Sequence, residues 1–118
     1  MKNSFFISAV RNLNLVYRIR EELYGNRFEL KIVISSDRLN KNGFVLDFLD
    51  VEKILDKLES EIKGREINRV LGKRDFDFRE FLLYIKDFVA KYLKDKHIVI
   101  SEISLMNSEE GYIARFDS

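Results

Sequence analysis

The sequence contains no cysteine and only one histidine, His97, among its 118 residues. Without cysteine the chain has no disulfides and no thiolate nucleophile, so side-chain packing must supply its stability. A single histidine excludes a metal site built from several imidazoles. The composition therefore excludes thiolate chemistry and multi-histidine metal chemistry.

Proline, glutamine, threonine and tryptophan are also missing. Few thermolabile residues together with 35% charged residues are typical of heat-adapted proteins, whereas the lack of proline argues the other way. No apolar run approaches the ~20 residues that span a bilayer, and the first ten residues lack the layout of a signal peptide. We therefore expect a cytoplasmic protein with no membrane partner.

The charges of the chain nearly cancel. Lys and Arg number 21 and Asp and Glu number 20, which leaves a net charge of +1. Such a balance supplies no field that would attract nucleic acid, so none is expected as a partner. The length and a hydrophobic fraction of 46% suit one globular domain over residues 1–118.

Alternating apolar and polar residues predict four strands. Residues 5–17 and 28–35 show this period of two and are expected to pair antiparallel. Residues 98–105 and 112–116 repeat it, with a turn expected at residues 107–111.

Two helices are predicted between these pairs of strands. Asp47 suits an N-cap, apolar residues follow at helical spacing up to Ile62, and Gly64 is a natural stop. Asp77 caps a second apolar stripe, with Glu80 completing a capping box. The order ββααββ predicts an α+β fold, in which two helices cover one face of a four-stranded antiparallel sheet.

Several short motifs then occur in a familiar order. The clearest is Gly-x-Val-x-Asp-Phe at residues 43–48, just before the first predicted helix. The others are Ile7-Ser8-Ala9-Val10-Arg11, Tyr24-Gly25-Asn26, Ile67-Asn68, Asp77-Phe78-Arg79-Glu80, Ser101-Glu102 and Gly111-Tyr112-Ile113. In this order they resemble the 6-pyruvoyl-tetrahydropterin synthase and 6-carboxy-tetrahydropterin synthase family, over nearly the whole chain. The resemblance implies the tunnelling fold.

The resemblance also implies which chemistry has been lost. In the family three histidines hold zinc, and the matching positions here are Arg11, Tyr24 and Asn26. The catalytic cysteine has no counterpart, and the Asp-His pair that assists it aligns near Lys63-Gly64. The sequence therefore predicts no metal, no cofactor and no catalytic residue of the family, and favours a protein without enzymatic activity.

A ligand pocket is the feature most expected to survive. Glu102 matches the glutamate with which the family grips the pterin, and a carboxylate can accept two N–H donors from a guanidine-like ring edge. The predicted ligand-binding residues are Glu102, Tyr24, Asn26 and Arg11, for a pterin- or purine-like molecule. Three alternatives stay open: a surface ion pair for Glu102, drift after metal loss for Tyr24 and Asn26, and either a carboxylate partner or a solvent-exposed arm for Arg11.

The functional prediction is a zinc-less relative of the synthases that keeps a ligand pocket. One alternative is a metal-free pterin enzyme of the dihydroneopterin aldolase type that uses Tyr24 and Glu102, perhaps with Arg11. The other is a purely structural or interaction subunit. Because tunnelling-fold proteins form rings, the resemblance implies a homo-oligomer, trimer or hexamer, with the pocket between subunits and contacts at the first strand, Phe44 and Tyr112.

Overall fold

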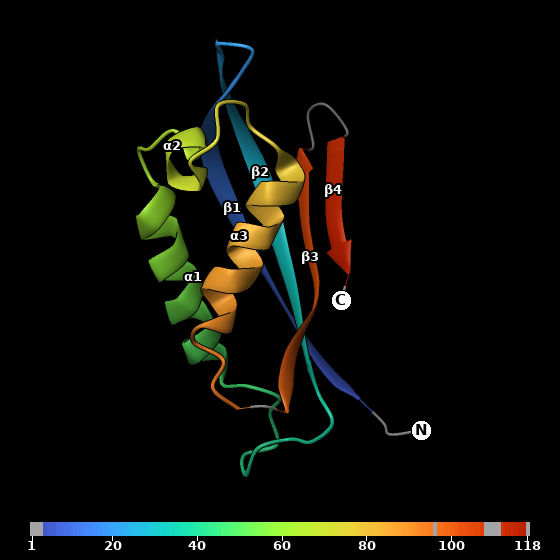
Figure 1. Ribbon diagram of the computed structural model, residues 1–118. Coiled ribbons are helices and arrows are strands. Elements are labelled where there is room, and N and C mark those ends of the chain that lie inside the picture. The colour runs from blue at the N-terminus through green and yellow to red at the C-terminus, as the bar shows by residue number, and fades with distance from the viewer. Residues whose placement is uncertain (1–3, 96, 108–111, 118) are drawn as a thin grey trace.

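A four-stranded antiparallel sheet forms one layer of the protein in a computed structural model, which describes residues 4–95, 97–107 and 112–117. The strands are β1 (Phe5–Ile19), β2 (Glu22–Ser36), β3 (Ile98–Asn107) and β4 (Tyr112–Asp117). They lie in chain order, so that β1 and β4 are the two edges of the sheet (Figure 1).

The second layer consists of helices on one face of the sheet (Figure 1). Within the described residues these are α1 (Phe48–Ile62), α2 (Ile67–Leu71) and α3 (Phe78–Ala90). None of them is long and apolar enough to cross a membrane.

The two long helices begin at the predicted caps. The side chains of Asp47 and Asp77 accept hydrogen bonds from the backbone N–H groups of Leu49 and Arg79. Each bond satisfies an amide of the first turn that has no partner within its helix. Gly64 follows α1 with a φ of 73°, in the left-handed region that glycine adopts at little steric cost.

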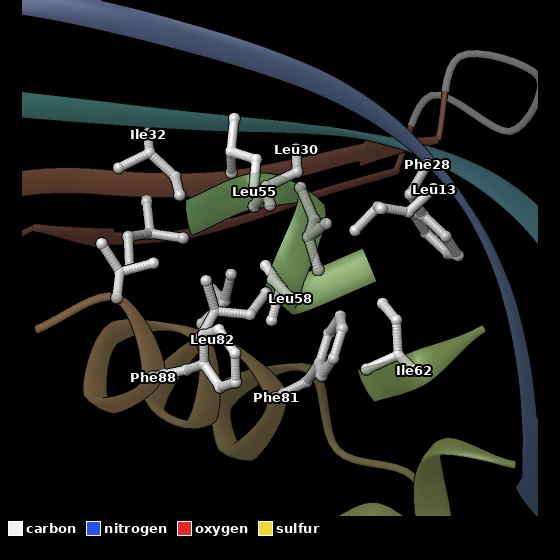
Figure 2. Close-up of a cluster of buried hydrophobic side chains, with 14 of the residues drawn as sticks. Leu13, Phe28, Leu30, Ile32, Leu55, Leu58, Ile62, Phe81, Leu82 and Phe88 are labelled. Atoms are coloured by element: carbon white, nitrogen blue, oxygen red, sulfur yellow. The ribbon is translucent and has the colours of Figure 1, made fainter. Parts of the chain in front are cut away.

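The core lies between the sheet and the helices. Every second side chain of β1 and β2 points toward the helices, and these side chains, including Leu13 and Leu30, are almost fully buried. Figure 2 shows how they meet Leu58 of α1 and Phe81 of α3, both fully buried. Removing this apolar surface from water is the main stabilising contribution to the fold.

The turn between β1 and β2 has an unusual backbone. It consists of Arg20 and Glu21, whose φ angles are 52° and 70°. A two-residue hairpin turn with both φ angles positive normally contains asparagine or glycine. The loop before α3 compensates, because the N–H of Arg20 donates to Asp75 at 2.9 Å and Arg74 pairs with Glu21 at 3.2 Å.

Asn68 joins three segments next to this turn. It is 5% exposed, and its carboxamide accepts from the N–H of Arg18 at 2.7 Å. The same carboxamide donates to the carbonyl groups of Arg18 and Arg74 at 2.9 and 2.8 Å. Asn68 thereby holds β1, α2 and the loop before α3 in one arrangement.

The α+β class and the helical cover on one sheet face agree with the sequence prediction, but the number of helices does not. The described residues contain three helices instead of two. The additional helix, α2, has five residues and no side-chain cap, so it is too short to produce a helical period in the sequence. The predicted turn at residues 107–111 lies outside the described residues apart from Asn107.

Replacing Asn68 with alanine should lower the free energy of unfolding by about 2–3 kcal/mol, because three hydrogen bonds disappear and buried backbone groups lose their partner. Urea denaturation measures this change. The control is Asn12→Ala, at an exposed position of β1, which should cost less than about 0.5 kcal/mol. Equal losses in the two variants would contradict the role given to Asn68.

Candidate ligand-binding site

A cavity of about 280 Å³ lies on the helix face of the sheet, at the end that carries the Arg20–Glu21 turn. Side chains of β1, β2, β3 and α3 form its walls. All of them are uncharged: Tyr17, Ile19, Tyr24, Asn26, Phe28, Phe78 and Asn107. We call this space the tyrosine–asparagine cavity.

Aromatic rings form much of the wall of the tyrosine–asparagine cavity. Tyr17 and Tyr24, direct partners across the β1–β2 ladder, stack with their ring centroids 5.6 Å apart and their planes 16° from parallel. Phe28 and Phe78 meet edge to face at 5.5 Å. Flat aromatic walls of this kind suit a planar ligand.

Polar groups interrupt this aromatic wall at a few points. The Nδ2 of Asn26 donates to the hydroxyl of Tyr17 at 2.8 Å. Asn107 also contributes a carboxamide and is only 2% exposed. An apolar pocket with a small number of convergent polar groups is the usual form of a small-molecule site.

Tyr24 lies at the rim of the cavity and is 38% exposed. Its hydroxyl donates to the carboxylate of Glu22 at 3.0 Å. This hydrogen bond to Glu22, together with the negative charge of the carboxylate, raises the pKa of Tyr24 above its ordinary value of 10.0, because both favour the neutral phenol. Tyr24 therefore keeps its proton at neutral pH.

Two of the four predicted ligand-binding residues, Tyr24 and Asn26, line the cavity, whereas Arg11 lies elsewhere on the same face. In the ladder Asn26 is opposite Leu15 and Arg11 is opposite Leu30. Arg11 is therefore four residues away along β1, which corresponds to about 13 Å.

Arg11 is bound to α1. Its guanidinium donates to Glu52 at 2.7 Å, to Asp56 at 2.9 Å and to Glu59 at 3.0 Å, and the side chain is 17% exposed. Burial lowers the pKa of Arg11, but these hydrogen bonds outweigh burial and raise it above 12.5. The expectation that Arg11 pairs with a carboxylate is thus confirmed, and its side chain does not extend freely into solvent.

Glu102 lies on the sheet face away from the helices. Its neighbour Ile103 is fully buried on the helix face, and side chains alternate along a strand. The carboxylate of Glu102 pairs with Arg115 at 2.7 Å and with Lys31 at 3.7 Å, and it is 16% exposed. Within one chain Glu102 therefore does not share the tyrosine–asparagine cavity, and two cations already balance its charge.

The three positions that the resemblance assigns to zinc do not fit that metal. Zinc prefers thiolate, imidazole or carboxylate ligands within about 2.3 Å, and these positions hold a guanidinium, a phenol and a carboxamide. The β1 residues that lie opposite Tyr24 and Asn26 are Tyr17 and Leu15, which are no better. No group of three or more His, Cys, Asp or Glu residues in the described part of the chain could hold a metal ion.

Three residues of the cavity, Tyr17, Phe78 and Asn107, were not selected from the sequence. The signal for Tyr17 depends on the hairpin register, since a turn at Arg20–Glu21 places Tyr17 directly opposite Tyr24. Phe78 was recognised only as the first apolar residue of a helix. Asn107 ends β3 and resembles an ordinary turn residue in the sequence.

Comparison with known proteins agrees with this arrangement. The family model described as 6-pyruvoyl tetrahydropterin synthase matches residues 2–116. The synthase of Caenorhabditis elegans superposes with a TM-score of 0.81 over 99% of this chain and 97% of its own, at 9% identity. The Plasmodium falciparum synthase gives a TM-score of 0.72 over 98% of this chain and 99% of its own, at 16% identity.

A similarity at the sequence level points to another named activity. Dihydroneopterin monophosphate aldolase of Pyrococcus furiosus is 28% identical over 90 residues, which are 76% of this chain and 75% of that protein.

These similarities define the class of the protein. The superpositions confirm the tunnelling fold of the pterin synthases that the sequence predicts. Since the family model covers nearly the whole chain, the chain belongs to the 6-pyruvoyl tetrahydropterin synthase family.

Replacing Arg11 with methionine should lower the free energy of unfolding by about 1 kcal/mol at low salt, a value kept small by the exposure of the three carboxylates. The loss arises because the carboxylates on α1 then repel one another. It should shrink at about 1 M NaCl, where the Debye length is about 3 Å. Urea denaturation at both salt concentrations measures it.

The control is Arg27→Met, at an exposed position of β2, which should change stability by less than about 0.5 kcal/mol at either salt concentration. An Arg11→Met loss that does not depend on salt would argue that the arginine acts through packing of its aliphatic stem instead.

Proposed function

We propose that this protein binds a pterin- or purine-like ring in the tyrosine–asparagine cavity and that binding requires no zinc. The observation that carries the proposal is the cavity itself, where stacked tyrosines and two carboxamides meet in an uncharged space. The function of the protein is then recognition of a small heterocycle on a family scaffold whose metal positions have been replaced.

The size and walls of the cavity support a small planar ligand. Ligand pockets usually measure about 300–1,000 Å³, so a volume of about 280 Å³ suits one bicyclic ring rather than a large cofactor. Stacking on an aromatic side chain contributes about 1–3 kcal/mol per base in nucleic-acid complexes, and the same physics applies to a pterin.

The comparisons support the pterin class of ligand. The matching family model is named for a synthase of a tetrahydropterin, and the Pyrococcus furiosus relative is named for an aldolase of a dihydroneopterin phosphate. Both names refer to the same bicyclic ring, which is the part of the ligand that the cavity would receive.

Replacing Tyr24 with alanine should weaken the binding of neopterin about tenfold, because one stacking wall is lost. Fluorescence titration of the pterin measures the dissociation constant. Tyr92→Ala is the matched control, since Tyr92 is 37% exposed against 38% for Tyr24 and does not line the cavity. No saturable binding to the wild-type protein, or equal weakening in both variants, would refute the proposed site.

A second candidate function is aldol cleavage of a dihydroneopterin-type substrate without metal. It is favoured by the name of the Pyrococcus furiosus relative and by the Tyr24–Glu22 pair at the rim of the cavity. In this reaction a base takes the proton of a side-chain hydroxyl, the electron pair of the broken C–C bond moves into the ring, and an acid returns a proton. Tyr24 would relay the hydroxyl proton to Glu22.

The surroundings of the cavity do not select a phosphate group. An adjoining hollow shares Ile19 and Phe78 with the cavity. Its charged lining residues are two basic and three acidic side chains, namely Lys73, Arg79, Asp75, Asp77 and Glu80. Both phosphorylated and unphosphorylated dihydroneopterin are therefore substrates to assay.

Replacing Glu22 with glutamine should lower the cleavage rate about 100-fold, a typical contribution of general acid–base catalysis. It should also lower the pKa of Tyr24 toward 10.0, because the negative charge that stabilises the neutral phenol is removed. Ultraviolet difference titration of the phenolate measures this pKa. Glu29→Gln, on the other face of β2, is the control, and absence of turnover by the wild-type protein with either substrate would reject the aldolase function.

We propose further that the protein forms a homo-oligomer, trimer or hexamer, with the cavity near a contact between copies. The two edge strands β1 and β4 support this proposal, because unpaired strand edges favour association. Phe6 and Phe44 are 63% and 56% exposed, while the side chain of Tyr112 lies outside the described residues. Light scattering at micromolar concentration should give the mass of at least three chains of 14.1 kDa, and a monomer would contradict the proposal.

A further inference from the structure

The hydrogen bond between Tyr17 and Asn26 gives the cavity a polar pair in a fixed orientation. Tyr17 is 5% exposed, so its hydroxyl has little contact with bulk water. Asn26 donates to the oxygen of this hydroxyl at 2.8 Å. The bond uses one N–H of the carboxamide and one lone pair of the phenol.

Both partners retain further hydrogen-bonding capacity. A tyrosine hydroxyl carries one donor and a carboxamide carries an oxygen acceptor and a second N–H. Once Asn26 donates to Tyr17, the O–H of Tyr17 and the Oδ1 of Asn26 remain for other partners. A donor and an acceptor therefore lie next to each other on the wall of the cavity.

The charge of the surroundings limits what this pair can bind. The seven residues that line the cavity are all uncharged. The ionised group that lies nearest in the hydrogen-bond network is the carboxylate of Glu22, held by Tyr24 at the rim. A ring that entered as an anion would lose its hydration without gaining a counter-charge, which is costly.

We infer that Tyr17 and Asn26 together recognise a neutral ring edge that presents an acceptor beside a donor, with the Tyr17 hydroxyl donating and the Asn26 oxygen accepting. This inference rests on the proposed function and adds its specificity. The lactam edge of a neutral pterin, a carbonyl oxygen next to a ring N–H, is such an edge. Recognition here differs from a carboxylate that accepts two N–H donors, since a phenol and a carboxamide match one of each.

Two substitutions in the full-length protein test the pair, with pterin as the probe and fluorescence titration as the readout. Tyr17→Phe removes the donor and keeps the ring, so pterin should bind about three- to tenfold more weakly. Asn26→Asp should weaken binding at least tenfold, because the carboxylate accepts the Tyr17 proton and repels the carbonyl oxygen of the ring. Tyr84→Phe and Asn12→Asp, which lie outside the cavity, should bind pterin within twofold of wild type.

The wild-type protein supplies a test that does not depend on the folding of any variant. Pterin loses a ring proton in mildly alkaline solution, and its affinity should fall in step with the remaining fraction of neutral ring. The raised pKa of Tyr24 keeps that side chain neutral over the same range. An affinity that stays constant while the ring ionises would overturn the inference.

The outcomes separate the inference from the proposed function. If wild type does not bind pterin, both fail. If wild type binds, and either both cavity variants bind within twofold of it or the affinity ignores ring ionisation, the proposed function stands and recognition by Tyr17 and Asn26 is rejected. Weaker binding confined to the two cavity variants, together with loss of affinity on ring ionisation, supports the pair.

Discussion

The unbroken pairing of β1 with β2 is the constraint on which the candidate site depends. Each residue from 5 to 19 pairs with one from 22 to 36, and a shift by one residue would turn every side chain of one strand to the other face. This register stacks Tyr17 on Tyr24 and brings Asn26 within hydrogen-bond distance of Tyr17. The Arg20–Glu21 turn sets the register, and Asp75 and Arg74 hold that turn in its left-handed backbone conformation.

The same register explains why the zinc positions of the family do not form a metal site here. Tyr24 and Asn26 lie together, whereas Arg11 lies four residues farther along β1 and is held by three carboxylates of α1. In this chain Arg11 links the sheet to α1, and Tyr24 and Asn26 face an uncharged cavity. The polar residues at the family's metal positions thus serve two different interactions, one structural and one suited to a neutral ligand.

Much of the fold follows from local signals in the sequence. Period-two alternation indicates the strands, and Asp47 and Asp77 give the starts of α1 and α3, because capping depends on neighbouring residues only. The Arg20–Glu21 turn and α2 escape prediction, since tertiary contacts from Asp75 and Asn68 stabilise them rather than their own residue types. The site is therefore half predictable: the family resemblance selects Tyr24 and Asn26, but Tyr17 and Asn107 require the register and the strand order.

The central claim is that a cavity on the helix face binds a pterin-like ring and that zinc takes no part. Titration of neopterin against protein dialysed with EDTA, repeated with one equivalent of added zinc, tests it most directly. The account predicts the same dissociation constant within twofold in both titrations, and no zinc retained after gel filtration. Binding that appears only when zinc is added, with one zinc retained per chain, would contradict it.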